Sequence, residues 1–134
     1  MSTPSPQEVI PEVETVTRDG LVYHQLSTEP LTGTVVSFNE NGQLLGRGNY
    51  IDGERDGLRE SFHKNGQLWW RGNYIDGEKD GLHELFHENG QLWWRGNYKD
   101  GKEEGLFENF DENGNLSITL TYRNGELVKM NRNP

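Results

Sequence analysis

The 134-residue sequence contains no cysteine and no alanine, and it has no long apolar run. Without cysteine the chain cannot form disulfides, thiolate nucleophiles or cysteine-ligated zinc sites. The lack of alanine, together with 17 glycines, disfavours a helical bundle. No apolar segment approaches the roughly 20 residues that span a bilayer, and no signal peptide is recognisable. We therefore expect a cytoplasmic chain; a periplasmic or lipoprotein form stays open if the N-terminus is truncated.

Basic residues are also scarce, since 13 Lys and Arg face 22 Asp and Glu for a formal net charge of −9. This charge disfavours nucleic-acid phosphates and anionic lipid, so we expect no nucleic-acid partner and no strong membrane binding. It favours a basic protein partner. Leu, Ile, Val and Phe number only 30, close to the composition of disordered chains, but 14 aromatic residues argue against disorder.

A 24-residue period organises the chain. Asn-Gly-Gln-Leu begins at positions 41, 65 and 89, and Gly-Asn-Tyr begins at 48, 72 and 96. A fixed period of this length is typical of a repeat array. Each copy has two extended segments joined by short glycine turns, which predicts consecutive β-hairpins. We expect repeat copies near residues 33–56, 57–80, 81–104 and 105–128.

The copy at 81–104 illustrates the predicted hairpin. Residues 81–87 and 91–98 are the expected strands. Glu-Asn-Gly at 88–90 predicts a tight turn because Asn-Gly favours positive φ, and residues 99–102 predict a slightly longer one. The predicted fold is all-β, an elongated antiparallel β-meander of about ten strands between residues 20 and 130. Residues 1–17 hold three of the five prolines and are expected to be a flexible acidic tail before a repeat domain at 18–134.

Because the period is even, equivalent side chains share one face of the sheet. We therefore expect the equivalent residues of neighbouring copies to stack: Leu68 on Leu92, Trp70 on Trp94 and Tyr74 on Tyr98. A turn that places Tyr50 opposite Gly57 also predicts a charged ladder across neighbouring strands, with opposite-charge pairs worth about 0.2–1 kcal/mol each. The expected pairs are Arg47–Glu60, Arg71–Glu84 and Arg95–Glu108.

Residues 50–57, Tyr-Ile-Asp-Gly-Glu-Arg-Asp-Gly, resemble the Tyr…Gly…Gly core of MORN (membrane occupation and recognition nexus) repeats. The fuller unit, with Asn-Gly-Gln-Leu and Gly-Asn-Tyr-x-Asp-Gly-x-x-Asp-Gly, is similar to the bacterial variant of this repeat, found in YwqK-family antitoxins. The resemblance covers about residues 19–130. It implies an elongated β-meander and a protein-binding role in which an antitoxin or immunity protein masks a toxin.

One catalytic motif is present, because residues 83–87, His-Glu-Leu-Phe-His, match H-E-x-x-H. That motif binds zinc on a helix, whereas on a strand residues four apart are separated by about 13 Å. Residues 52–57 resemble a calcium loop but lack its closing Glu. We expect no catalytic residue, no metal and no cofactor, and hence a protein that is not an enzyme.

Two tryptophan pairs are the most informative candidates for a binding surface. Adjacent strand residues point to opposite faces, so one indole of each pair can be core while the other is exposed beside an arginine, as at binding hot spots. The alternative, in which both faces are covered, stays open. The candidate partner-binding residues are Trp69, Trp70, Arg71, Trp93, Trp94, Arg95, His63 and His87.

The sequence thus predicts a non-enzymatic protein-binding module, an antitoxin or immunity protein that binds and neutralises a basic toxin. The alternative is a structural or scaffolding module for protein or membrane association. A metalloprotease and an acidic DNA mimic are further alternatives. The oligomeric state and the partner's identity are not specified by the residues.

Overall fold

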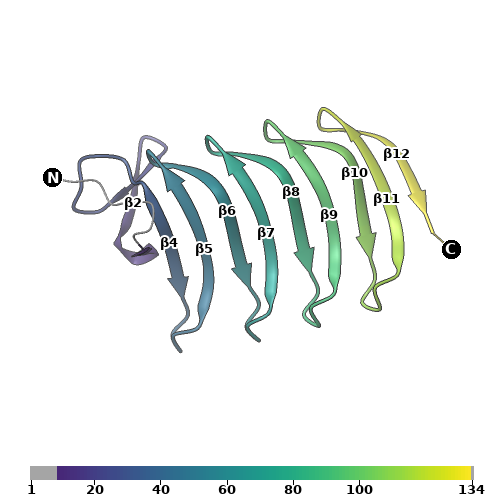
Figure 1. Ribbon diagram of the computed structural model, residues 1–134, viewed down its shortest axis with the longest axis horizontal. Coiled ribbons are helices and arrows are strands. Elements are labelled where there is room, and N and C mark those ends of the chain that lie inside the picture. The colour runs from purple at the N-terminus through teal and green to yellow at the C-terminus, as the bar shows by residue number, and fades with distance from the viewer. Residues whose placement is uncertain (1–8, 134) are drawn as a thin grey trace.

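The structure, a computed structural model, describes residues 9–133 and is an elongated row of strands (Figure 1). The main sheet has ten strands in the order β1-β4-β5-β6-β7-β8-β9-β10-β11-β12. From β4 onward each strand pairs antiparallel with the next, so the predicted β-meander is confirmed. These strands are β1 (Val9–Pro11), β4 (Gly33–Phe38), β5 (Leu44–Ile51), β6 (Glu54–Phe62), β7 (Leu68–Ile75), β8 (Glu78–Phe86), β9 (Leu92–Lys99), β10 (Lys102–Phe110), β11 (Leu116–Arg123) and β12 (Glu126–Arg132).

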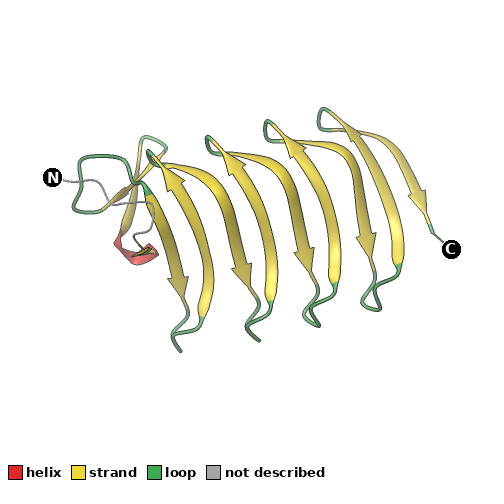
Figure 2. Cartoon of the chain, viewed as in Figure 1, coloured by secondary structure: helices red, strands yellow, loops and turns green. Residues whose placement is uncertain are grey.

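An N-terminal cap covers the first end of this sheet. It consists of β1, a short 3₁₀ turn η1 (Glu12–Glu14), and a separate hairpin of β2 (Thr15–Arg18) and β3 (Leu21–His24), shown at the left of Figure 2. β1 pairs parallel with β4, which makes the main sheet mixed. The prediction of a flexible tail is therefore wrong for residues 9–17; residues 1–8 lie outside the described part.

The cap shields the otherwise unpaired edge of β4 and the apolar side chains at this end of the array from water. The terminal repeats of such arrays commonly require a capping element of this kind. A small core of Ile10, Leu31, Val35 and Tyr50 lies there, with Val22 of the cap hairpin packed against it. The Val22 N–H donates to the Gly53 carbonyl at 2.9 Å, which fastens the cap hairpin to the first turn of the array. Four of the six buried apolar side chains of the described residues lie at this end.

The two kinds of turn are interchanged relative to the prediction. The Asp-Gly segments form the tight turns: Asp52 and Gly53 have φ of 49° and 84°, the pattern of a two-residue type I′ turn. The Asn-Gly segments lie in longer loops at residues 63–67 and 87–91. There Asn65 keeps negative φ and its Oδ1 accepts a hydrogen bond from the Gln67 N–H at 2.9 Å. Asn-Gly thus acts through an Asx hydrogen bond, which the longer loop requires.

The predicted ladder register is confirmed, but the predicted turn register is wrong. Arg47 faces Glu60, whereas Tyr50 faces Arg55 and not Gly57. A bulge between these two pairs takes up the extra residues, and Gly57 has a positive φ of 88° within it. The tight Asp-Gly turn shifts the pairing near the turn, and the bulge restores the register farther along the strands.

Glycines form a row across the sheet that receives large side chains from the neighbouring strands. Gly72 faces Arg59 on one side and His83 on the other, and a Cβ at Gly72 would overlap the His83 ring. Gly48 and Gly96 are covered in the same way by Arg59 and Phe107. Because this sheet has no second layer to pack against, its large side chains lie across the neighbouring strand, at the positions where that strand has glycine.

The predicted direct stacking of equivalent residues is wrong, because equivalent strands lie two apart in the sheet order. The shared face is correct, but the contacts pass through the intervening strand. Tyr74 and Tyr98 both pack against His83 of β8, with ring centroids 5.7 and 4.8 Å away. Each repeat is therefore linked to the next by the residue that lies over its glycine.

We expect Gly72→Ala to lower the free energy of unfolding by about 1–3 kcal/mol, because the added methyl group meets the His83 ring. Urea denaturation of the single and double variants measures this. In the His83→Ala background the ring is gone, so Gly72→Ala should cost clearly less. Strictly additive effects of the two substitutions would contradict the glycine-row packing.

Candidate functional site

The two faces of the sheet carry different side chains. We call one the tyrosine face, defined by Tyr50, Tyr74, Tyr98 and Tyr122, and the other the ladder face, defined by the three Arg–Glu pairs. The N-terminal cap packs on the tyrosine face. Figure 1 shows β6 to β12 as successive strands of one sheet beyond the cap.

The ladder face carries a central row of three ion pairs. Arg47 Nε lies 2.6 Å from Glu60 Oε1, the Arg71–Glu84 pair has the same distance, and the Arg95–Glu108 pair is at 2.8 Å. The glutamates are largely covered while each arginine is about half exposed. Each guanidinium also lies over a phenylalanine ring. These rings are Phe62, Phe86 and Phe110, with centroids 6.0, 5.6 and 5.6 Å away.

The structure separates the two members of each tryptophan pair. Trp69 and Trp93 lie on the ladder face with 45% and 43% of their surface exposed. Trp70 and Trp94 lie on the tyrosine face and are half-buried; Trp70 packs against Tyr74 at a centroid distance of 6.2 Å. The ladder face thus brings together Trp69, Arg71, Trp93 and Arg95, and it leaves the other two indoles out.

The candidate histidines serve as links between repeats. His63 Nε2 lies 3.0 Å from the Phe86 carbonyl oxygen, and His87 Nε2 lies 3.0 Å from that of Phe110. Since a carbonyl only accepts, each Nε2 carries the proton. Each ring also packs beside an exposed indole, His63 with Trp69 at 5.8 Å and His87 stacked on Trp93 at 5.0 Å. They support the tryptophans from the loops.

Sequence reasoning missed a second apolar row on the ladder face. Three leucines lie two residues before the ladder glutamates and are therefore on the same face. All three are exposed: Leu58, Leu82 and Leu106. The signal was their equal spacing of 24 residues and their even separation from the glutamates. The ladder face therefore has an arginine row flanked by leucines on one side and by tryptophans on the other.

Acidic residues border this face along the row of tight turns. Asp52, Glu54, Asp76, Glu78 and Asp100 are all exposed there. The carboxylates of the central row are neutralised by arginines, so the net negative charge concentrates at the edge of the face.

The H-E-x-x-H residues lie in and just beyond strand β8, not on a helix. His83 is fully buried on the tyrosine face, and its Nε2 donates to the Asn73 carbonyl oxygen at 2.9 Å. His87 instead bonds the carbonyl oxygen of Phe110, the last residue of β10. Within residues 9–133, no cluster of three or more metal-ligating side chains is present. No helix in this part of the chain is long and apolar enough to cross a membrane.

Burial lowers the pKa of His83, and the nearby Lys79 charge acts in the same direction. Its Nδ1 is buried without a hydrogen-bond partner. The native structure therefore favours the neutral imidazole.

These features define a repeat-built β-sheet that presents one open face of arginine, tryptophan and leucine side chains. The chain belongs to the MORN repeat variant family, whose pattern matches residues 31–52, 55–76, 79–100 and 103–124. Each of the four matches begins two residues before the corresponding copy predicted from the period. MORN repeats of this kind indicate a protein- or membrane-binding module.

Comparison with curated proteins gives no match. Among solved structures, a mutant of S. aureus TarM is similar with 15% identity and a TM-score of 0.45. A second TarM crystal structure has 15% identity and a TM-score of 0.43. Each alignment covers 87% of this chain and 21% of the TarM chain, so this chain spans about a fifth of their length.

Truncating the two members of a tryptophan pair should have different effects on stability. We expect Trp69→Ala to cost about 1 kcal/mol or less because the indole is exposed. Trp70→Ala should cost roughly 2–4 kcal/mol because it removes packing against Tyr74 and His83. Thermal and urea unfolding measure both. Equal losses would show that Trp69 also belongs to the packed interior.

The lowered pKa of His83 predicts a pH dependence of stability. The unfolded chain binds this proton more readily, so stability is retained above the ordinary histidine pKa of about 6.5 and lost as pH falls below it. Urea unfolding between pH 7.5 and 5.5 should show this loss. His83→Phe, which copies Phe107 of the following repeat, should weaken the dependence. An unchanged pH profile in His83→Phe would contradict the assignment.

Proposed function

We propose that this chain is a non-enzymatic binding module that acts as an antitoxin or immunity protein, with the ladder face as its contact surface for a basic toxin. The observation that carries the proposal is the pair of exposed tryptophans beside paired arginines. Trp and Arg dominate binding hot spots. Exposed apolar rows on a sheet face are typical of partner surfaces.

The ladder face is suited to a rigid, preformed contact. The arginines are held by a glutamate and a phenylalanine each, and the tryptophans rest on loop histidines. Side chains that are already fixed lose little rotamer entropy on binding. The sheet can thus bind without reorganisation of its own surface.

The charge distribution supports a basic partner. Exposed carboxylates line the tight-turn edge of the ladder face, and the chain has a net charge of −9. Such an edge attracts a positively charged protein and accelerates encounter at low salt. A basic enzyme whose active surface contacts nucleic acid fits this requirement, because an acidic rim competes for the same basic side chains.

The second candidate function is a scaffolding module for protein or membrane association. The observation that favours it is again the exposed row of Trp69 and Trp93, since tryptophans beside arginines also suit a membrane interface. The acidic edge opposes attachment to anionic lipid. We expect no flotation of the protein with vesicles of anionic phospholipid; flotation that depends on Trp69 and Trp93 would favour this second function.

The proposed function predicts the effect of removing both exposed tryptophans. Co-expression of the chain with the toxin encoded beside its gene should restore growth, and Trp69→Ala/Trp93→Ala should abolish the rescue while the variant stays folded. Two hot-spot tryptophans at about 2 kcal/mol or more each correspond to at least a several-hundredfold loss of affinity. Calorimetry with the purified toxin measures this.

The matched control is Leu127→Ala/Met130→Ala, which removes exposed apolar side chains of β12 that lie opposite Tyr122 and Leu120, on the tyrosine face. This control should keep both rescue and affinity. The proposal fails if growth is not restored by the native chain, or if the tryptophan variant protects as well as the control.

A further inference from the structure

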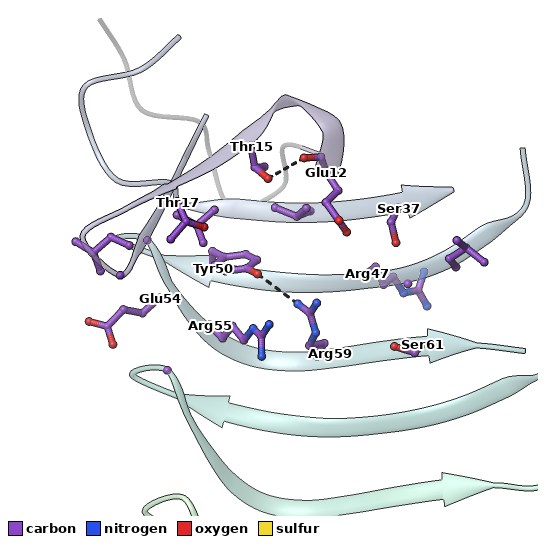
Figure 3. Close-up of a pocket in the computed structure, with 18 residues that line it drawn as sticks. Glu12, Thr15, Thr17, Ser37, Arg47, Tyr50, Glu54, Arg55, Arg59 and Ser61 are labelled. Carbon is purple, nitrogen blue, oxygen red and sulfur yellow. Dashed lines mark hydrogen bonds between the residues drawn. The ribbon is translucent and has the colours of Figure 1, made fainter. Parts of the chain in front are cut away.

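A polar hollow of about 680 Å³ lies beneath the N-terminal cap, on the tyrosine face and so on the opposite side of the sheet from the ladder face (Figure 3). Side chains of β4, β5 and β6 form its floor, and residues of η1, β2 and β3 line the side of the cap. Cavities of roughly 300–1,000 Å³ are the usual size of small-molecule sites.

The hollow exists because the repeat is interrupted at this point. Gly46 occupies the position that Trp70 and Trp94 hold in the next two copies, 24 and 48 residues later. Its neighbours across the sheet are Ser37 and Ser61, whereas Trp70 has Leu85 as its neighbour on β8. An indole and a leucine side chain are thus replaced by a hydrogen atom and a hydroxyl, which leaves an open, polar floor where the cap lies above.

Three arginines line this hollow, and Arg47 is paired with Glu60 on the ladder face, which leaves two guanidinium groups without such a pair. Arg55 and Arg59 are both on β6, and Figure 3 shows both side chains beside Tyr50. Arg59 Nη1 donates to the Tyr50 hydroxyl at 3.4 Å, and Arg55 lies over the Tyr74 ring at 5.5 Å. Within residues 9–133, neither guanidinium has a carboxylate within salt-bridge distance.

The carboxylates near the hollow do not neutralise this charge. The Glu54 side chain points toward the next tight turn. Its Oε2 lies 3.2 Å from the point where a Cβ on Gly77 would stand. Glu12 belongs to η1 on the side of the cap. In the next copy the equivalent positions hold Lys79 and His83. The two arginines therefore occur together only in the copy that lies under the cap and has glycine in place of tryptophan.

We propose that this hollow binds a small polar molecule that carries a phosphate or carboxylate group. Guanidinium groups bind both kinds of oxyanion through charge-assisted, bidentate hydrogen bonds. Arg55 and Arg59 contact the anionic group, and the hydroxyls along the floor and the cap contact its polar body. These hydroxyls belong to Ser37, Ser61, Tyr50, Thr15 and Thr17.

Calorimetric titration of the full chain tests this site with glucose 6-phosphate and glucuronate as probes and glucose as the uncharged control. We expect saturable binding of at least one charged sugar and none of glucose, and the two charged probes distinguish phosphate from carboxylate. Arg55→Gln and Arg59→Gln should each weaken binding about tenfold or more. Arg123→Gln, which removes an exposed guanidinium at the end of β11 and outside the lining of the hollow, should bind as the native chain does.

Gly46→Trp supplies a second variant, because it restores the residue of the next two copies and fills the floor. We expect it to abolish binding while the strand signal in circular dichroism is unchanged; if this variant does not fold, the two arginine variants decide. The proposal is overturned if no charged probe binds at millimolar concentration. It is also overturned if Arg55→Gln and Arg59→Gln bind as tightly as the native chain.

Discussion

The structure depends on one packing constraint, which is that a sheet of one layer must bury its large side chains against itself. The glycine row meets this constraint by leaving Gly48, Gly72 and Gly96 open beneath the side chains of the next strand. Every ring placed this way contacts the repeats on both sides, as His83 does with Tyr74 and Tyr98. Stability is therefore a sum of contacts between neighbours, as expected of repeat arrays.

This arrangement also separates packing from binding. Because the period is even, the side chains that pack over the glycine row accumulate on the tyrosine face, and the ion pairs with their flanking tryptophans and leucines accumulate on the other. The tryptophans and leucines of the ladder face are exposed, so they are available to a partner. The cap closes one end of the tyrosine face, and the missing indole at Gly46 leaves space beneath it.

Much of this organisation could be predicted from the sequence, because the repeat specifies strands, register and face together. The Arg–Glu pairing was predicted from a turn register that is wrong, and it holds because the bulge restores the pairing farther along the strands. The separation of Trp69 from Trp70 followed from the alternation of side chains along a strand. The cap could not be predicted, since its pairing with β4 joins a short divergent segment to the array without a repeated signal. The roles of the two turns were interchanged because Asp and Asn both adopt positive φ, and the side-chain hydrogen bond of Asn65 decides between them. The capped hollow was missed because the glycine at position 46 leaves a cavity only where another segment lies above it. The cap that lies there could not be predicted from the sequence.

The most direct test of the account is the unfolding of a chain from which one complete copy, residues 57–80, has been deleted. The remaining strands keep their faces because the deleted length is even. We expect cooperative folding, with the free energy of unfolding and the urea m-value both lowered by about one repeat's share. A deletion variant that fails to fold, or one whose stability and m-value equal those of the full chain, would contradict the account.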